Sequence, residues 1–304
     1  NIVTVSTDEL PYEEKTIIDH SSSEISTEDA AVLLEAVRKE LENDIYKFYV
    51  GTSYRHLTIW DKGEVVDLTP PHDVLGQKIG QYLPKDDKLR EMMKKSYDIL
   101  SNHPINVERM KRGLNPANSL WFWGAGTRPM LTSFEEKTGH KGAMISAVDL
   151  LKGIAVGAGM KVIEVEGANG GLDTNYEGKA DAAVDVLLNG GCDFAYIHLE
   201  APDEMGHQGS YERKVKAIEN LDKRIIKRVV EKMEAAGEDF RMLVLPDHPT
   251  PVAIRTHVSD PVPYMLYDST DKKNNTWSYN EKDGEASGNY IAEGHTIINR
   301  LFEK

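Results

Sequence analysis

A carboxylate and an imidazole follow an apolar run in the middle of the chain, and their spacing is the one most suited to chemistry. The run spans residues 194–199 and has the composition of a strand, and Asp203 and His207 stand four residues apart just after it. A second apolar run ends in Asp247 and His248. Because open α/β sheets place their sites at the carboxyl ends of strands, both pairs are expected at such an edge.

A further imidazole, His257, follows the second pair. Aspartate and histidine are common at strand ends and helix caps, so a single pair would be explained better by a structural role than by metal binding. Two pairs and a nearby third histidine favour a metal site. Oxygen and imidazole ligands suit manganese, zinc or magnesium rather than copper or an iron–sulfur cluster.

The composition combines an acidic surplus with enough apolar residues for a real core. The chain has 304 residues, 40% of them hydrophobic, and its formal net charge is −14 from 50 acidic and 36 basic residues. Nucleic-acid phosphates are bound by basic surfaces, so this charge argues against nucleic acid as a partner. A small anionic substrate needs only a few basic side chains and is still allowed.

Targeting signals and cysteine usage bear on the compartment. No window approaches the roughly 18 continuous apolar residues of a membrane span, and the first twenty residues are too acidic and polar for a secretory signal. The single cysteine, Cys192, cannot form an internal disulfide and fits a reducing compartment. We therefore expect a cytoplasmic protein with no membrane partner, and the sequence leaves a homo-oligomer open.

The elements that must position these residues fall into two expected domains. In residues 1–115, a helix after Ser26 is predicted from apolar side chains at helical spacing, and short strands and a second helix follow. In residues 116–304, strands alternate with helices, which is typical of a parallel sheet. The expected fold class is therefore α/β, a mostly parallel sheet flanked by helices, with a smaller α+β domain.

Several expected elements have definite bounds. Strands are predicted over residues 65–68 and 120–123, the second of them as the first strand of the parallel sheet. Helices are predicted over 211–236 and, at the end of the chain, 290–302, and a polar surface loop over 268–287.

Two arginines stand where a ligand could reach them. Arg55 lies at the entrance of a predicted strand, and Arg128 follows the glycines at the end of another. A guanidinium group matches a carboxylate or phosphate with two hydrogen bonds, so an acidic phosphorylated substrate is one interpretation, and surface ion pairs are the other. The glycine-rich stretches do not match the dinucleotide fingerprint, and no nucleotide is assigned.

The order of the motifs resembles a known family. The segments 203–207 and 246–248, followed by His257 and the run 260–263, are similar to the alkaline phosphatase superfamily. Within it, the chain resembles the archaeal-type branch of the cofactor-independent phosphoglycerate mutases in the segments 54–56, 121–126 and 141–150. The likeness covers nearly the whole chain.

The resemblance implies a mechanism and a set of roles. In such enzymes two metal ions, usually manganese, zinc or magnesium, flank a serine that takes the phosphoryl group from 3-phosphoglycerate and returns it to give 2-phosphoglycerate, without 2,3-bisphosphoglycerate. By motif match, Asp203, His207 and His257 would hold one ion, while Asp247 and His248 would contribute to the other. The candidates for binding the glycerate carboxylate and phosphate are Arg55, His56, His72, Asp73, Arg128 and Lys141.

Part of the family pattern is not found in the chain. The family has a Gly-Asp-Gly strand end, whose aspartate binds the second metal, and soon after it the nucleophilic serine. The run Ser21 to Ser23 does not fit that serine, and residues 2–6 have the composition of a strand already under way. We therefore expect a longer polypeptide whose upstream segment supplies the first strand, the serine and the aspartate. Residues 1–115 would then be the inserted substrate-handling domain.

Two other interpretations are left open by the sequence. A different metal-dependent phosphatase or phosphomutase of the superfamily would use the same metal ligands without holding a glycerate. An inactive, truncated metal-binding fragment would account for the missing serine, although the five downstream ligands weigh against it.

Overall fold

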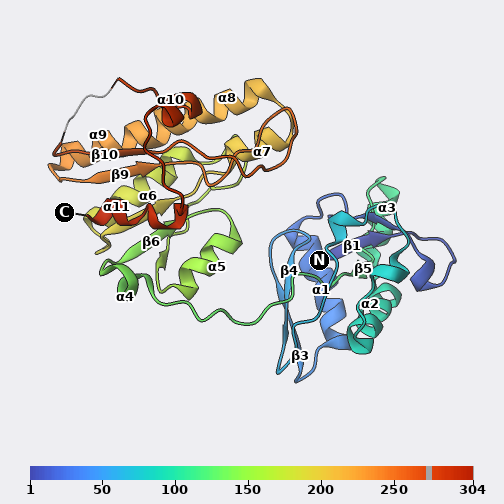
Figure 1. The fold of residues 1–304 in the computed structure, drawn as a ribbon. Helices are drawn as coiled ribbons and strands as arrows, with labels where there is room; N and C mark the ends of the chain where they lie inside the picture. Colours follow the sequence, from blue (N-terminus) through green and yellow to red (C-terminus); the bar gives the residue numbers. More distant parts are fainter. Residues whose placement is uncertain (272–275, 304) are drawn as a thin grey trace. The chain divides into compact units, whose positions relative to one another are not determined.

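The computed structural model describes residues 1–271 and 276–303. The chain divides into two compact units, Asn1–Arg128 and Pro129–Lys304, and each is described by itself (Figure 1). The sequence placed the domain boundary at residue 115. In the structure the segment after residue 115 belongs to the first unit because its residues pair with the first strand there.

The first unit contains a three-stranded antiparallel sheet with the strand order β2-β1-β5. Its strands are β1 (Ile2–Val5), β2 (Ile17–Asp19) and β5 (Ser119–Leu120). A separate antiparallel hairpin is formed by β3 (Tyr46–Val50) and β4 (His56–Trp60). Every residue of β1 is buried, which fits its position at the centre of the sheet.

The helices of the first unit are α1 (Thr27–Leu41), α2 (Asp87–Leu100) and α3 (Pro104–Lys111), with short 3-10 turns at Tyr12–Glu14, Pro71–Asp73 and Ile79–Tyr82. The predicted cap of α1 is found, because the Ser26 side chain accepts a hydrogen bond from the Asp29 N–H. Leu33, Leu34 and Val37 form the buried face of α1, and they belong to one core with residues of β3, α2 and β5.

Two strand predictions for this unit were wrong. Residues 120–123 do not begin the parallel sheet, since Leu120 pairs antiparallel with Ile2 and its N–H donates to the Ser96 hydroxyl. Residues 65–68 form no strand in the described part of the chain: Val66 and Leu68 pack their side chains on the core, and their backbone pairs with no described strand.

The second unit contains the predicted parallel sheet, with β6 (Gly142–Ile145) between β7 (Lys161–Val162) and β8 (Phe194–Ile197). The flanking helices are α4 (Phe134–Thr138), α5 (Asp149–Gly157) and α6 (Tyr176–Leu188). A second sheet pairs β9 (Arg241–Val244) antiparallel with β10 (Met265–Asp268).

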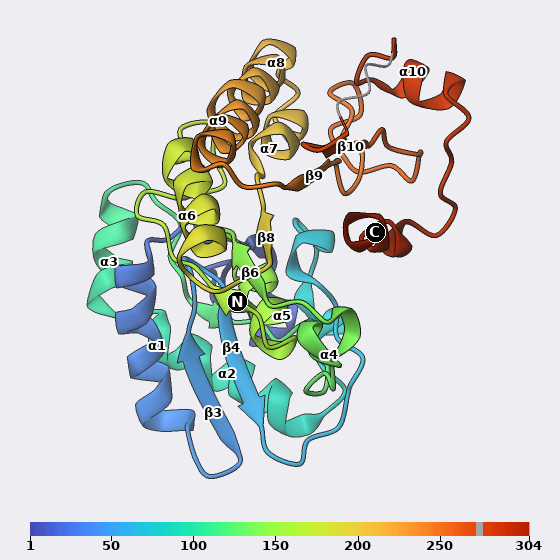
Figure 2. The ribbon, with the colours of Figure 1, turned by 90° about the vertical axis from the view of Figure 1, so that its left-hand side faces the viewer.

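The remaining helices of this unit are α7 (Ala201–His207), α8 (Tyr211–Asn220), α9 (Lys227–Ala236), α10 (Glu281–Ala286) and α11 (Asn299–Phe302). Figure 2 shows α8 and α9 running end to end, and a π-helical segment, Leu221–Ile226, joins them, so the predicted helix over 211–236 is confirmed. Residues of α6, α7, α8 and α9 share one apolar core. Two bidentate ion pairs, Arg224–Glu177 and Arg228–Asp181, hold this helical layer together.

The end of the chain differs from the prediction. The closing helix expected over 290–302 is reduced to a 3-10 turn at Gly294–Thr296 and to α11, which fits the weak helix propensity of the glycine inside the predicted run. The polar stretch expected as a loop contains α10, and its residues 272–275 lie outside the described part of the chain.

Two strand edges of the second unit stand next to the candidate metal ligands in sequence. In the described residues, β8 pairs with β6 alone and β9 pairs with β10 alone, so each has one edge without a partner strand. The first edge strand leads into α7 and the second into Asp247. Across the described residues, no helix has the length and apolar character needed to cross a membrane.

Candidate metal centre

Helix α7 places the first Asp–His pair. It begins after Glu200, three residues beyond the end of β8, with Pro202 in its first turn, where proline is compatible with a helix. Asp203 and His207 are four residues apart, so their side chains lie on one face of α7. Asp203 and His207 are 31% and 37% exposed, which leaves both accessible to a small ion.

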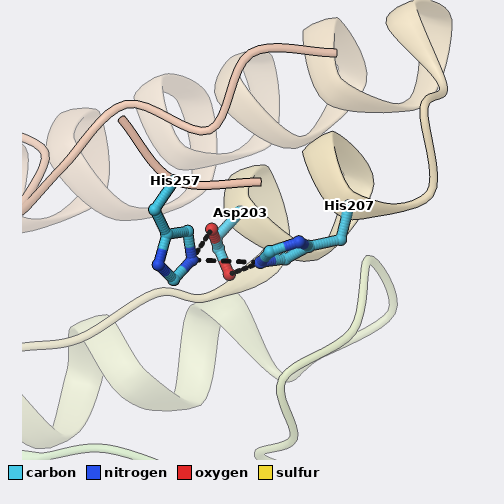
Figure 3. Close-up of side chains that lie close together, drawn as sticks. All are labelled: Asp203, His207 and His257. Atoms are coloured by element: carbon cyan, nitrogen blue, oxygen red, sulfur yellow. Dashed lines mark hydrogen bonds and ion pairs between the residues drawn. The ribbon is translucent and has the colours of Figure 1, made fainter. Parts of the chain in front are cut away.

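Asp203, His207 and His257 converge on one point although His257 comes from a distant loop (Figure 3). The Nε2 atoms of the two histidines are 3.0 Å apart. The Asp203 carboxylate lies 3.3 Å from His207 Nε2 and 3.2 Å from His257 Nε2 through its two oxygens. Two imidazole nitrogens and a carboxylate are a donor set that suits zinc or manganese.

The hydrogen bond on the far side of His207 shows how this ring would bind an ion. His207 Nδ1 lies 3.0 Å from the backbone oxygen of Arg255. A carbonyl oxygen accepts hydrogen bonds, so Nδ1 carries the proton and a neutral His207 presents its lone pair at Nε2. Arg255 has a φ of 56°, a conformation that costs energy for a side chain of its size and that aims its carbonyl at the ring.

The second pair lies beside the first. The ring of His248 is tilted against that of His257, with 3.8 Å between the ring centroids, and His248 Nε2 is 3.4 Å from an oxygen of Asp247. The structure therefore gathers four of the five predicted ligands through direct contacts, and Asp247 joins them through His248. Asp247 is 65% exposed, which leaves its carboxylate accessible.

Sequence reasoning missed the residues that support these ligands. Thr250 is buried, and its hydroxyl hydrogen-bonds Asp203 and lies 3.3 Å from His248 Nδ1. Its carbonyl oxygen accepts a hydrogen bond of 2.6 Å from the Lys214 ammonium group, whose pKa is lowered by burial. A threonine between two prolines and a lysine on a charged helix have no spacing that marks them as parts of a metal site, so the sequence carried no signal for them.

A polar cluster follows β6 and β8 in the same unit. Ser146 Oγ is 3.3 Å from His198 Nδ1, and the fully buried Lys179 donates to the backbone oxygen of His198. Burial lowers the pKa of both His198 and Lys179, and the nearby negative charge of Asp247 opposes this for His198. His198 directly follows the last residue of β8. The structure places it in the electrostatic field of Asp247 and Asp203.

Five of the six predicted substrate-binding residues lie in the first unit. Arg55 is exposed and stacks on Tyr54 at 4.9 Å, and His56 begins β4 and accepts a hydrogen bond from Gly51 N–H. Burial lowers the pKa of His56 to about 4. His72 and its neighbour Asp73 are exposed. Their role in binding stays a prediction.

His72 belongs to an aromatic cluster that the sequence did not indicate. Its ring lies 6.1 Å from that of His20 and 5.4 Å from that of Trp123, and His20 contacts Tyr54 edge-on at 5.6 Å. His20 was missed because it is a lone histidine after a short strand. The predicted ligand-binding residues Arg128 and Lys141 are exposed, the first as the last residue of the first unit and the second just before β6.

Comparison with known proteins assigns the chain to a family. The pattern of the metalloenzyme superfamily matches residues 51–294. A 2,3-bisphosphoglycerate-independent phosphoglycerate mutase of Methanosarcina barkeri is 49% identical over 277 residues, which cover 90% of this chain and 67% of that protein. A protein named as a probable mutase of this kind in Geobacter sulfurreducens is 42% identical, with 94% of this chain and 72% of that protein covered.

A solved structure supports the fold. The PH0037 protein from Pyrococcus horikoshii superposes with a TM-score of 0.74 at 26% identity, covering 92% of this chain and 69% of that one. The chain spans about two thirds of the length of the curated relatives it matches. With a family pattern over most of its length and the relatives at these identities, the chain belongs to the 2,3-bisphosphoglycerate-independent phosphoglycerate mutases of the metalloenzyme superfamily.

Proposed function

We propose that this chain takes part in the interconversion of 3-phosphoglycerate and 2-phosphoglycerate by phosphoryl transfer at a metal centre, without 2,3-bisphosphoglycerate. The observation that carries the proposal is the convergence of Asp203, His207 and His257, with His248 against His257. The names of the relatives support the substrate, and the donor set supports the chemistry.

The residues present fit two divalent cations, with manganese, zinc and magnesium as the proposed identities. Asp203, His207 and His257 would hold one ion, and Asp247 and His248 would contribute to the other. Bound there, such ions would lower the pKa of an attacking hydroxyl and neutralise charge on a transferring phosphoryl group. The chain's own contribution is to fix the orientation of the ligands, which the Arg255 carbonyl does for His207.

We propose that the serine that carries the phosphoryl group comes from a segment beyond the 304 residues. Thr250 has a hydroxyl in contact with Asp203, but it is buried and engaged, which does not suit a nucleophile. Within the described residues, β8 and β9 each have one edge without a partner strand, and each is followed by candidate metal ligands, which supports a further strand beside the site. Relatives that are longer by about a third have the length to supply both.

We propose that the substrate's carboxylate and phosphate are bound by exposed basic side chains. Arg55 and His72 are the first choices, because both are exposed and they border the aromatic cluster with His20. A guanidinium group and neutral imidazoles can donate several hydrogen bonds to such a ligand. The other predicted residues are the exposed Arg128 and Lys141, the partly buried His56 and the acidic Asp73. A cytoplasmic location, the absence of nucleic-acid partners and a homo-oligomer stay predictions from the sequence.

The test is an assay that follows 2-phosphoglycerate and free phosphate together, with and without Mn²⁺ and in the absence of 2,3-bisphosphoglycerate. It should be run on the 304-residue chain and on a chain joined to the remaining segment of a mutase relative. Metal-dependent isomerisation by the joined chain supports the proposal. Release of phosphate alone would instead identify a phosphatase, and a joined chain that binds Mn²⁺ but turns over neither product would identify an inactive metal-binding protein.

A further inference from the structure

The loop that carries Asp247 and His248 packs tightly against the helix that carries Asp203 and His207. The contact is so close at Gly206 that an added Cβ would lie 2.5 Å from the Thr250 backbone oxygen and 2.9 Å from its Cγ2. The same backbone oxygen accepts the hydrogen bond from Lys214 on α8. Thr250 is thus fixed from two sides, with its hydroxyl held between the two pairs of ligands.

The single hydrogen of the Thr250 hydroxyl limits which hydrogen bonds this group can make. The hydroxyl has one hydrogen to donate, and it lies in hydrogen-bond contact with the Asp203 carboxylate and 3.3 Å from His248 Nδ1. A carboxylate can only accept, so the hydrogen goes to Asp203. Toward His248 the hydroxyl can then only accept, which requires the proton of a neutral His248 to be on Nδ1.

We propose that Thr250 is a positioning residue for both ligand pairs. This proposal rests on the metal-dependent function proposed above. Its hydroxyl holds the Asp203 carboxylate and selects the tautomer of His248 that leaves the Nε2 lone pair for a divalent cation. His207 is prepared in the same way by a different acceptor, since the Arg255 carbonyl fixes its proton on Nδ1. Partners of this kind usually set the ring orientation and basicity of metal-bound histidines.

The opposite tautomer of His248 has one feature in its favour. His248 Nε2 is 3.4 Å from an oxygen of Asp247, a distance at which an N–H could point toward the carboxylate. That arrangement would require the Thr250 hydrogen to go to His248 and would leave the short contact between Asp203 and the hydroxyl without a proton. It would also leave His248 without a free nitrogen for a cation at Nε2. The contact between Asp203 and Thr250 therefore favours the Nδ1–H form.

The experiment compares the full chain with Thr250→Val, which keeps the shape and removes the hydroxyl, and Thr250→Ser, which keeps the hydroxyl. Thr174→Val is the matched control, because Thr174 is a buried threonine of the same unit whose hydroxyl accepts from Asn169 N–H. Two quantities are measured: the Kd for Mn²⁺ by calorimetry, and the tautomer of His248 by ¹H–¹⁵N NMR of the metal-free protein. The spectra are taken at about pH 8, above the ordinary imidazole pKa of about 6.5.

We expect Nδ1–H in wild type and Thr250→Ser, a shift toward Nε2–H in Thr250→Val, and a Kd for Mn²⁺ that Thr250→Val raises about 10- to 100-fold. Thr174→Val should bind like wild type. An Nε2–H tautomer in wild type, or Mn²⁺ binding by Thr250→Val as tight as by the control, would overturn the role of Thr250. If Thr250→Val does not fold, the tautomer of His248 in wild type still tests the proposal, because Nε2–H there would contradict it. If neither the 304-residue chain nor the chain joined to the remaining segment of a relative binds Mn²⁺, the proposed function fails, while the spectra still test Thr250.

Discussion

The close contact between α7 and the loop that ends at Thr250 makes Gly206→Ala an informative substitution. The new methyl group would lie 2.5 Å from the Thr250 carbonyl oxygen and 3.1 Å from Lys214 Nζ. The first distance is well inside van der Waals contact, and the oxygen belongs to a backbone held by a hydrogen bond. The loop must therefore move away from α7 to make room.

Two opposing free-energy terms set the expected magnitude. Alanine gains up to about 1 kcal/mol over glycine from helix propensity, whereas overpacking a close contact costs about 1–3 kcal/mol. Because the obstacle is backbone rather than the end of a flexible side chain, we expect a net loss of about 1–2 kcal/mol in the free energy of unfolding. Displacement of Thr250 should also weaken Mn²⁺ binding by about tenfold or more.

The matched control is Gly153→Ala in α5, where no atom of the described residues lies within 4 Å of the added Cβ. This variant should gain stability, by up to about 1 kcal/mol, and bind Mn²⁺ like wild type. Urea unfolding and calorimetric Mn²⁺ titration of the three proteins give both quantities. If Gly206→Ala were stabilised as much as Gly153→Ala and bound Mn²⁺ like wild type, the loop would not pack against α7 as described.

Two further predictions concern the same unit. Mn²⁺ at 100 times its Kd should raise the free energy of unfolding of wild type by about 2.7 kcal/mol. His207→Ala should remove this rise. If the variant were still stabilised to that extent, His207 would be excluded as a ligand. The bidentate contact with Arg228 lowers the pKa of Asp181 to about 2, so this pair stabilises the fold above the ordinary carboxyl pKa and loses its effect as pH falls toward 2. Both side chains are more than a third exposed, so Asp181→Asn should lower the free energy of unfolding by no more than about 1 kcal/mol at pH 7 and by still less near pH 2. A loss in urea unfolding that does not depend on pH would contradict this.

The proximity of the candidate ligands could be predicted from sequence because local geometry determines much of their placement. Asp203 and His207 share a face of any helix by their spacing, and both pairs follow apolar strand-like runs. The sequence could propose His257 as a third ligand but could not predict its position, because that position depends on the path of a loop. The Thr250 hydroxyl and the Arg255 carbonyl contact the candidate ligands only in the folded chain, and Lys214 acts one step further away, through the Thr250 backbone oxygen.

The fold class was predictable, and the errors fall where local signals are weak. The alternation of strands and helices predicted the parallel sheet around β6, and that sheet is present. The strand at Ser119–Leu120 was assigned to the wrong sheet because two residues carry no information on their partner, which here is β1. The apolar residues at 65–68 were taken for a strand because packing on a core and strand pairing produce the same apolar pattern. In the described part of the chain, the partly buried Val66 and Leu68 pack on the core without strand pairing.

The central claim is that Asp203, His207 and His257 hold a divalent cation, and anomalous diffraction from crystals grown with Mn²⁺ tests it most directly. Data collected on both sides of the manganese absorption edge identify the ion by its scattering. We predict a manganese peak between His207 Nε2, His257 Nε2 and the Asp203 carboxylate, with the two imidazole nitrogens moved apart from their 3.0 Å separation to admit it. Well-ordered side chains at this point with no manganese peak among them, at a Mn²⁺ concentration that saturates binding in solution, would contradict the account.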